Sequence, residues 1–210
     1  MALHHLLSVT DLTRQEIEAL FELTALLKKR KVRLAQPLGG KTLGLMFQKP
    51  SLRTRLSFEV GMSQLGGQCT YFGPEDLQQG QRESAKDLAR VLSRYVDGIA
   101  ARPFAHADVV ELATWATVPV INALSDTHHP CQALSDLFTM HEHFGQVKSL
   151  KVAYIGDGNN VCHSLMHGCA FLGARGPVKP WLPCIERVGW PTRNSPARMT
   201  GSSSPRLREI

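Results

Sequence analysis

One stretch decides how this chain folds: Phe47-Gln48-Lys49-Pro50-Ser51-Leu52-Arg53-Thr54-Arg55. It follows a short apolar run, 42–47, that is typical of a buried strand, and apolar residues at helical spacing follow it. The stretch is therefore predicted to be a strand-to-helix turn at the carboxyl edge of a sheet. Its hydroxyls and positive charges join the unpaired N–H groups and positive partial charge of a helix start, a combination that favours phosphate. The alternative is a solvated basic helix start.

Composition limits the classes of protein and partner that the chain can represent. Its 210 residues are 43% hydrophobic, enough to bury a core in one large or two small domains. The net charge of +6 is uneven, because 173–210 holds seven Lys and Arg against two Asp and Glu. The remainder is nearly neutral and lacks a broad basic face, so we expect no nucleic acid partner.

Membrane association and export are not expected either. No apolar run is long enough to span a bilayer, and residues 1–9 are too short and too rich in His for a signal peptide. The five Cys form no C-x-x-C pair, and an odd count without framework spacing favours free thiols in a reducing compartment. The sequence therefore predicts a cytoplasmic protein.

Strand-like and helix-like segments alternate along the chain, with connections too long for hairpins. Strands are expected at 42–47, 69–72, 98–101, 118–123 and 151–155, and helices at 13–28, 52–65, 84–95, 107–115, 130–141 and 161–172. This order indicates an α/β fold with a doubly wound parallel sheet. The fold would comprise a complete N-terminal domain and the start of a second, Rossmann-like domain. Ligands of such sheets bind beyond the carboxyl ends of the strands.

Two further strand ends carry polar groups. Arg102 follows the strand at 98–101, and the segment 125–132 follows the strand at 118–123. Pro130 suits the first turn of a helix, so His129 and Gln132 are expected to project from the helix start toward one crevice. An imidazole and an amide placed there can donate hydrogen bonds to a polarised carbonyl. The alternative is a capped helix with polar groups at the surface.

The segment 156–164 contains two weaker signals. Its Gly-rich turn is similar to a dinucleotide-binding fingerprint but lacks the third Gly and the later acidic residue. Asn159 and Asn160 are either aimed at a ligand or form a helix cap. His163 and His167 are four residues apart near Cys162, so a metal site competes with partly buried helix histidines. The histidine pair lacks the Glu of an H-E-x-x-H motif, so no metal is expected.

Taken together, four motifs resemble the aspartate/ornithine carbamoyltransferase family. They are 51–55, the Gln-x-Gly-x-Arg-Glu-Ser segment at 78–84, Arg102, and the His-Pro-Cys-Gln segment at 129–132. The segments 81–92 and 156–164 are more similar to the ornithine enzymes than to the aspartate ones. The similarity runs from about Leu6 to Phe171 with the motifs in order.

The resemblance implies a carbamoyl phosphate-binding domain at 1–145 and the beginning of an ornithine-binding domain at 149–172. It implies catalytic roles for Thr54, Arg102 and His129, and an ornithine contact by Asn160. The contacts that it implies for carbamoyl phosphate are Ser51, Leu52, Arg53, Thr54, Gln78, Arg102, His129, Pro130, Cys131 and Gln132.

The implied reaction is transfer of the carbamoyl group to the δ-amino group of L-ornithine, which gives L-citrulline and phosphate in arginine biosynthesis or the urea cycle. The resemblance further implies a homotrimer in which the Gln78 loop reaches a neighbouring subunit's site. It implies no metal ion and no organic cofactor. Aspartate or putrescine carbamoyltransferase is the alternative within the enzyme class, and a nucleotide-binding module is a distant third possibility.

The chain departs from the family pattern in two places. The family has Thr where this chain has Leu52, and its later acidic Ser-Met segment and His-Cys-Leu-Pro loop are not found; Trp181 to Cys184 do not form that loop. From Gly173 the chain holds six of its twelve Pro, and 173–210 is predicted to be a disordered tail. The expectation is a chain truncated or frameshifted after about Phe171. A non-catalytic fragment that binds carbamoyl phosphate or full-length subunits is therefore the competing interpretation.

Overall fold

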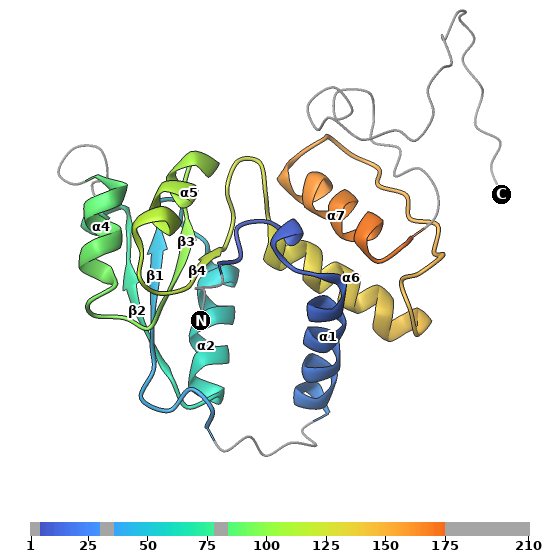
Figure 1. The fold of residues 1–210 in the computed structure, drawn as a ribbon, viewed down its shortest axis with the longest axis horizontal. Helices are drawn as coiled ribbons and strands as arrows, with labels where there is room; N and C mark the ends of the chain where they lie inside the picture. Colours follow the sequence, from blue (N-terminus) through green and yellow to red (C-terminus); the bar gives the residue numbers. More distant parts are fainter. Residues whose placement is uncertain (1–4, 30–35, 78–83, 175–210) are drawn as a thin grey trace, which may run out of the picture.

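The computed structural model describes residues 5–29, 36–77 and 84–174, in which strands and helices alternate (Figure 1). In chain order the elements are η1 (Val9–Asp11), α1 (Arg14–Lys28), β1 (Thr42–Phe47), α2 (Leu52–Gln64), β2 (Gln68–Phe72), α3 (Pro74–Leu77), α4 (Ala85–Leu92), β3 (Gly98–Arg102), α5 (His106–Trp115), β4 (Val120–Asn122), α6 (Pro130–Phe144) and α7 (Asn160–Phe171). The Gln78 loop and the tail from residue 175 onward lie outside the described residues.

The four strands form one parallel sheet in the order β2-β1-β3-β4, which confirms the predicted α/β class. Successive side chains of a strand point to opposite faces, and β1 shows this clearly. Leu45 and Phe47 pack with Phe58 of α2 on one face. Met46 packs on the other face with Leu88 of α4, in a cluster that α5 also joins. Helices thus cover both faces of the sheet.

A second apolar cluster joins α1, α6 and α7 beside the sheet (Figure 1). Ile17 of α1 is fully buried, and the rings of Phe21 and Phe138 lie 5.4 Å apart between α1 and α6. Leu165 and Cys169 bring α7 into the same cluster. Helix α7 therefore packs directly on α6.

Helix ends follow local sequence signals. Thr13 and Glu16 form a capping box at the start of α1, and the Ser84 hydroxyl accepts a hydrogen bond from the Asp87 N–H at the start of α4. Helix α6 ends at Gly145, whose φ of 78° places it in the left-handed region that glycine tolerates. Helix α4 is shorter than predicted, since it ends at Leu92. Tyr95, the last residue of the helix predicted at 84–95, is 79% exposed because it lies beyond the end of α4.

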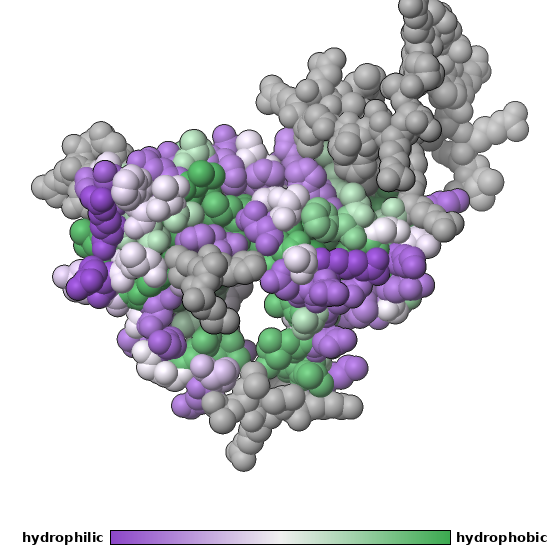
Figure 2. Space-filling model, in the orientation of Figure 1, coloured by the Kyte–Doolittle hydropathy of each residue, from purple (hydrophilic) through white to green (hydrophobic). Residues whose placement is uncertain are grey.

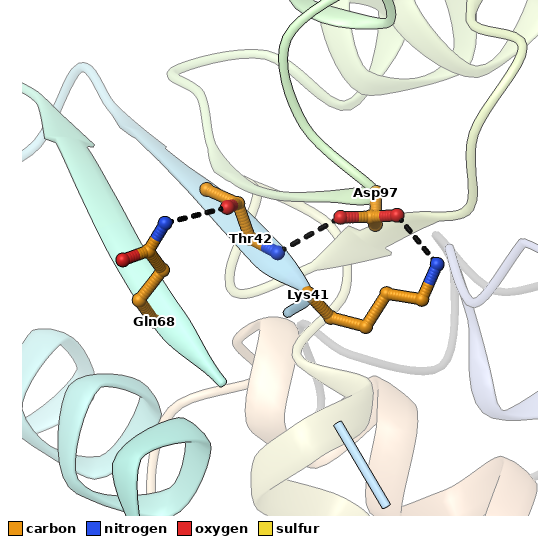
Figure 3. Close-up of polar contacts among 4 residues, drawn as sticks. All are labelled: Lys41, Thr42, Gln68 and Asp97. Carbon is orange, nitrogen blue, oxygen red and sulfur yellow. Dashed lines mark hydrogen bonds and ion pairs between the residues drawn. The ribbon is translucent and has the colours of Figure 1, made fainter. Parts of the chain in front are cut away.

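A polar cluster joins the amino ends of the strands (Figure 3). The Asp97 carboxylate accepts a 2.9 Å hydrogen bond from the Thr42 N–H and a 2.8 Å bond from the Lys41 ammonium group. The Gln68 amide donates to the Thr42 hydroxyl at 3.0 Å. The pKa of Asp97 is lowered by its two hydrogen bonds, more strongly by the one from Lys41 than by the one from the Thr42 N–H. The cluster ties β1 to β2 and to the turn before β3 at the edge opposite the predicted ligand site.

A cavity of about 540 Å³ opens at the same edge, between α2 and the sheet. Phe58, Met62, Leu43 and Ile121 line it, with Asp97 at its polar side. The cavity lies at the amino ends of β1 and β3, so it is distinct from the ligand edge. A separate hollow, between α2 and α1, is partly bordered by hydrophobic residues (Figure 2).

The strand predicted at 151–155 is not formed. Lys151 makes a single β-bridge, and no strand is assigned to 152–155. Val152 and Tyr154 are partly buried and pack against the apolar cluster that contains α7, whereas Ile155 is 96% exposed. Strands are stabilised by hydrogen bonds to a neighbour, and none of the four described strands lies beside this segment. None of the helices in the described ranges is long and apolar enough to cross a membrane.

Candidate functional site

The carboxyl ends of β1, β3 and β4 lie side by side, which brings three predicted loops to one edge. Phe47 pairs with Arg102, and Ala101 pairs with Asn122. The Gln48 N–H donates to the Arg102 carbonyl at 3.0 Å. The phosphate-type loop at 48–51, Arg102 and the segment 124–129 are therefore neighbours, as the predicted topology requires.

The start of α2 leaves its first-turn N–H groups without a side-chain cap. Ser51 is the N-cap, in extended conformation, but its hydroxyl donates to the Thr54 hydroxyl at 3.0 Å and caps no backbone N–H. Leu52 is 80% exposed, and Arg53 is also exposed. Uncapped N–H groups beside a guanidinium are suited to an anion.

The other cations of this loop are engaged elsewhere. The Arg55 guanidinium pairs with Glu59 at 2.9 Å and stacks 3.8 Å above the Tyr71 ring. The Lys49 ammonium group lies 4.9 Å from the centre of the Phe104 ring. Arg53 is therefore the strongest candidate in the loop for a phosphate contact.

Arg102 and His129 form the second part of the site. Burial lowers the pKa of Arg102, and its Nε is buried without a hydrogen-bond partner among the described residues. Burial, with a smaller effect from the Arg102 charge, lowers the pKa of His129 to about 4. The imidazole is thus neutral at pH 7 beside a cation, and its Nδ1 is also buried without a described partner. Buried polar atoms of this kind normally have a partner, which a ligand can supply.

The remaining residues of the 129–132 motif have different surroundings. Pro130 is buried in the first turn of α6. The Cys131 thiol donates to the Asn122 carbonyl at 3.6 Å, and burial raises its pKa to about 11. Gln132 is exposed, and its amide donates to Asp136 at 2.9 Å. The structure therefore does not bring the Gln132 amide to the His129 side chain.

Residues of the 156–164 segment cap α7 and dock it on the segment 125–129. The Asn159 side chain accepts hydrogen bonds from the N–H groups of Val161 and Cys162, so of the two readings the helix cap is the one observed. The Asn160 amide donates to the Ser125 carbonyl at 2.6 Å. Gln78, the other predicted contact, lies outside the described part of the chain.

Sequence reasoning missed the polar residues that shape the segment 125–129. Asn122 and Ser125 are fully buried. The Asn122 amide donates to the Leu7 carbonyl at 2.9 Å and to the Ser125 hydroxyl at 3.1 Å, and the His128 N–H donates to the same hydroxyl at 3.2 Å. Their one sequence signal is an amide at the end of the apolar run 118–123.

Four histidines adjoin this segment without forming a metal centre. The rings of His106 and His128 lie 4.8 Å apart, and those of His128 and His167 lie 5.8 Å apart. His163 and His167 are half-buried on α7. Within the described ranges, no group of three or more His, Cys, Asp or Glu is placed to hold a metal ion.

Known proteins share much of this sequence and fold. The sequence profile described as "Aspartate/ornithine carbamoyltransferase, carbamoyl-P binding domain" matches residues 4–142. The ornithine carbamoyltransferase of Symbiobacterium thermophilum is 53% identical over 170 residues, which cover 80% of this chain and 54% of that protein. The enzyme of the same name from Cenarchaeum symbiosum is 53% identical over 168 residues, covering 80% and 56%.

Solved structures of relatives have the same fold. The ornithine carbamoyltransferase from Pyrococcus furiosus matches with a TM-score of 0.79 at 51% identity, covering 82% of this chain and 56% of that chain. The Thermus thermophilus enzyme matches with a TM-score of 0.79 at 42% identity, covering 90% and 67%. The chain spans about half the length of the curated relatives it matches. By this profile match and these identities, the chain belongs to the aspartate/ornithine carbamoyltransferase family, and it contains the family's carbamoyl phosphate-binding domain.

Proposed function

We propose that this chain binds carbamoyl phosphate at the carboxyl edge of its sheet and supplies that half of the ornithine carbamoyltransferase reaction. One observation carries the proposal: the uncapped start of α2 lies beside Arg102 and a neutral His129, whose buried nitrogens lack described partners. The binding domain extends over 1–145. The segment 149–172 begins the ornithine domain, and Gly145 ends the last helix of the first.

The two parts of the site match the two ends of the ligand. Arg53 and the first N–H groups of α2 bind the phosphate and stabilise the charge that grows on it as it leaves. Thr54, Arg102 and His129 donate hydrogen bonds to the carbamoyl oxygen. The neutral imidazole keeps one N–H to donate and adds no charge next to Arg102. Preorganised donors of this kind favour an oxyanion.

The proposed acceptor is L-ornithine, since the relatives named above are ornithine carbamoyltransferases. The neutral δ-amino nitrogen forms a bond to the carbamoyl carbon, and the bond from that carbon to the phosphate oxygen breaks. The electron pair leaves with phosphate, and the nitrogen loses one proton, which phosphate or water takes up. Positioning the two substrates supplies much of the rate.

Carbamoyl phosphate binding without transfer is the second candidate. Among the described residues, Asn160 is the one that the resemblance expects to contact ornithine. Its side-chain amide instead donates a hydrogen bond to the Ser125 carbonyl at 2.6 Å. We therefore expect the isolated chain to bind carbamoyl phosphate and to form no citrulline above background with ornithine. A colorimetric citrulline assay at saturating substrates measures this, and steady citrulline formation would show that the chain carries an acceptor site as well.

A homotrimer in the cytoplasm is the proposed state of the protein. Helix α2 has no buried residue, and Leu52, Leu56 and Val60 form an exposed apolar stripe along it. A second copy of the chain is a suitable cover for such a stripe. The four described cysteines are all free thiols, which fits a reducing compartment.

Thermal protection by ligand tests the proposed site. Carbamoyl phosphate, and inorganic phosphate at higher concentration, should raise the melting temperature, because a ligand that binds only the folded state stabilises it. Arg53→Ala should abolish this protection, since the other cations of the loop are paired or stacked elsewhere. The matched control is Arg14→Ala, which removes an exposed guanidinium at the first residue of α1. Equal protection of wild type and Arg53→Ala would refute the assignment.

A further inference from the structure

We propose that Ser164 is a positioning residue of the carbamoyl phosphate site. From α7 its hydroxyl holds the backbone of His129, and through that backbone it sets the place of the imidazole. The inference rests on the proposed function, because it concerns the group that meets the carbamoyl end of the ligand. Ser164 ends the segment 156–164 that resembles the ornithine enzymes, and the resemblance gives its hydroxyl no role.

One face of α7 holds successive backbone groups of the segment 125–129. Asn160, His163 and Ser164 are spaced three and four residues apart, which places them on one side of the helix. The Asn160 amide donates to the Ser125 carbonyl at 2.6 Å, and the His163 ring lies 3.3 Å from the Thr127 carbonyl.

Ser164 makes the contact nearest the site. Its hydroxyl accepts a hydrogen bond from the His129 N–H at 2.8 Å. Hydrogen bonds from α7 therefore hold the segment 125–129 on one side. On the sheet side, the Asn122 amide and the His128 N–H both donate to the Ser125 hydroxyl.

The Ser164 hydroxyl satisfies a donor that α6 cannot satisfy. His129 is the N-cap of α6, and N–H groups at a helix start have no acceptor within the helix. Ser164 is fully buried, so water does not readily replace its hydroxyl. Removing the oxygen would leave a partly buried N–H unsatisfied, and the His129 peptide would have to move to find another partner.

Such a movement would affect one end of the ligand more than the other. The His129 imidazole serves the carbamoyl oxygen, whereas the phosphate is bound by Arg53 and the start of α2, on another loop. A shift of the imidazole by a fraction of an ångström weakens a hydrogen bond that depends on distance and angle. Loss of Ser164 is therefore expected to weaken carbamoyl phosphate binding selectively, with phosphate binding retained.

Calorimetry on the full chain tests this selectivity with two ligands. Ser164→Ala is expected to raise the Kd for carbamoyl phosphate by about tenfold, the effect of losing one aligned hydrogen bond. The Kd for inorganic phosphate should stay within about twofold of the wild-type value. Ser135→Ala is the matched control, because its exposed hydroxyl bonds only the Cys131 carbonyl within α6.

Hydrogen exchange on the wild-type chain gives a second, independent measurement. The His129 amide should be protected from exchange although it caps a helix, because Ser164 accepts its hydrogen bond. Exchange at the rate of an unstructured peptide would overturn the inference, even if Ser164→Ala does not fold.

The outcomes also separate this inference from the proposed function. Unchanged carbamoyl phosphate affinity in Ser164→Ala, or a parallel loss of both affinities, would refute the positioning role and leave the proposed function standing. A wild-type chain that binds carbamoyl phosphate no better than phosphate would instead refute the proposed function, and this inference with it.

Discussion

At the scale of single residues, Leu52 is the position where the proposed site departs from the family pattern. It occupies the first position of α2 and is 80% exposed, so its side chain stabilises little of the fold. The resemblance puts Thr at this position, and we propose that its hydroxyl would contact the phosphate. Its backbone N–H is unaffected by the change, and we infer that Leu52 weakens the anion site without abolishing it.

Leu52→Thr should therefore bind carbamoyl phosphate more tightly. A hydrogen bond to a charged group contributes about 1.5–3 kcal/mol, and we expect affinity to increase by about tenfold to a hundredfold. Calorimetry checks the gain, with Leu56→Thr one turn later as the matched control at a second exposed leucine of the same helix. Unchanged affinity in Leu52→Thr would mean that no hydroxyl is used at this position.

At the scale of elements, the segment 125–129 and its histidines couple the end of β4 to α7. Burial, and then the neighbouring His106, His167 and His163, lower the pKa of His128 to about 4, whereas Asp11 acts weakly in the opposite direction. The pKa values of His106 and His167 are lowered as well, chiefly by burial. Asp126 partly offsets this at His106. The packed segment therefore favours neutral imidazoles.

Acid should destabilise the folded chain in a defined window. The usual pKa of His128 is 6.5, so between pH 6.5 and about 4 the unfolded chain binds a proton that the folded chain does not. Above pH 6.5, His128 should therefore not reduce the free energy of unfolding. As the pH falls from 6.5 toward 4, this free energy should decrease. Half-exposure of the ring reduces the size of the effect.

Melting curves from pH 4 to 8 measure this dependence. His128→Phe keeps a ring in contact with His106 and His167 but cannot titrate, so its melting temperature should vary less with pH. His143→Phe, at an exposed position near the end of α6, should keep the wild-type slope. Identical slopes in wild type and His128→Phe would show that this ring does not carry the effect.

At the scale of the whole molecule, the exposed stripe on α2 is the surface proposed for a second copy. Leu56 lies in the middle of the stripe and is 53% exposed, and no residue of α2 is fully buried. A charge placed there should leave the monomer folded and oppose association, because an interface core disfavours unpaired charges.

Leu56→Asp should therefore dissociate the trimer. Analytical ultracentrifugation at several concentrations would show trimers for wild type and monomers for the variant, with unchanged circular dichroism. Val110→Asp is the matched control, since Val110 is 42% exposed on α5, away from the stripe. A wild-type chain that stays monomeric at high concentration would contradict the proposed trimer, and a trimeric Leu56→Asp would place the interface elsewhere.

The sequence by itself determined the α/β class, the positions of the first four strands along the chain and the loops that meet at one edge. These follow from local signals: apolar periodicity, the capping box at Thr13, the proline at the start of α6 and the basic turn at 48–55. The parallel sheet then brings the loops together, because all its strands end at one edge.

Only the tertiary structure decided the contacts between distant segments. The bond from the His129 N–H to Ser164 spans 35 residues, and no local pattern marks it. The neutral state of His129 depends on burial by surrounding elements, which an isolated His-Pro pair does not reveal. The apolar run at 151–155 carried a strand signal and formed no strand, because β-structure needs a neighbour to pair with whereas a helix satisfies its own backbone.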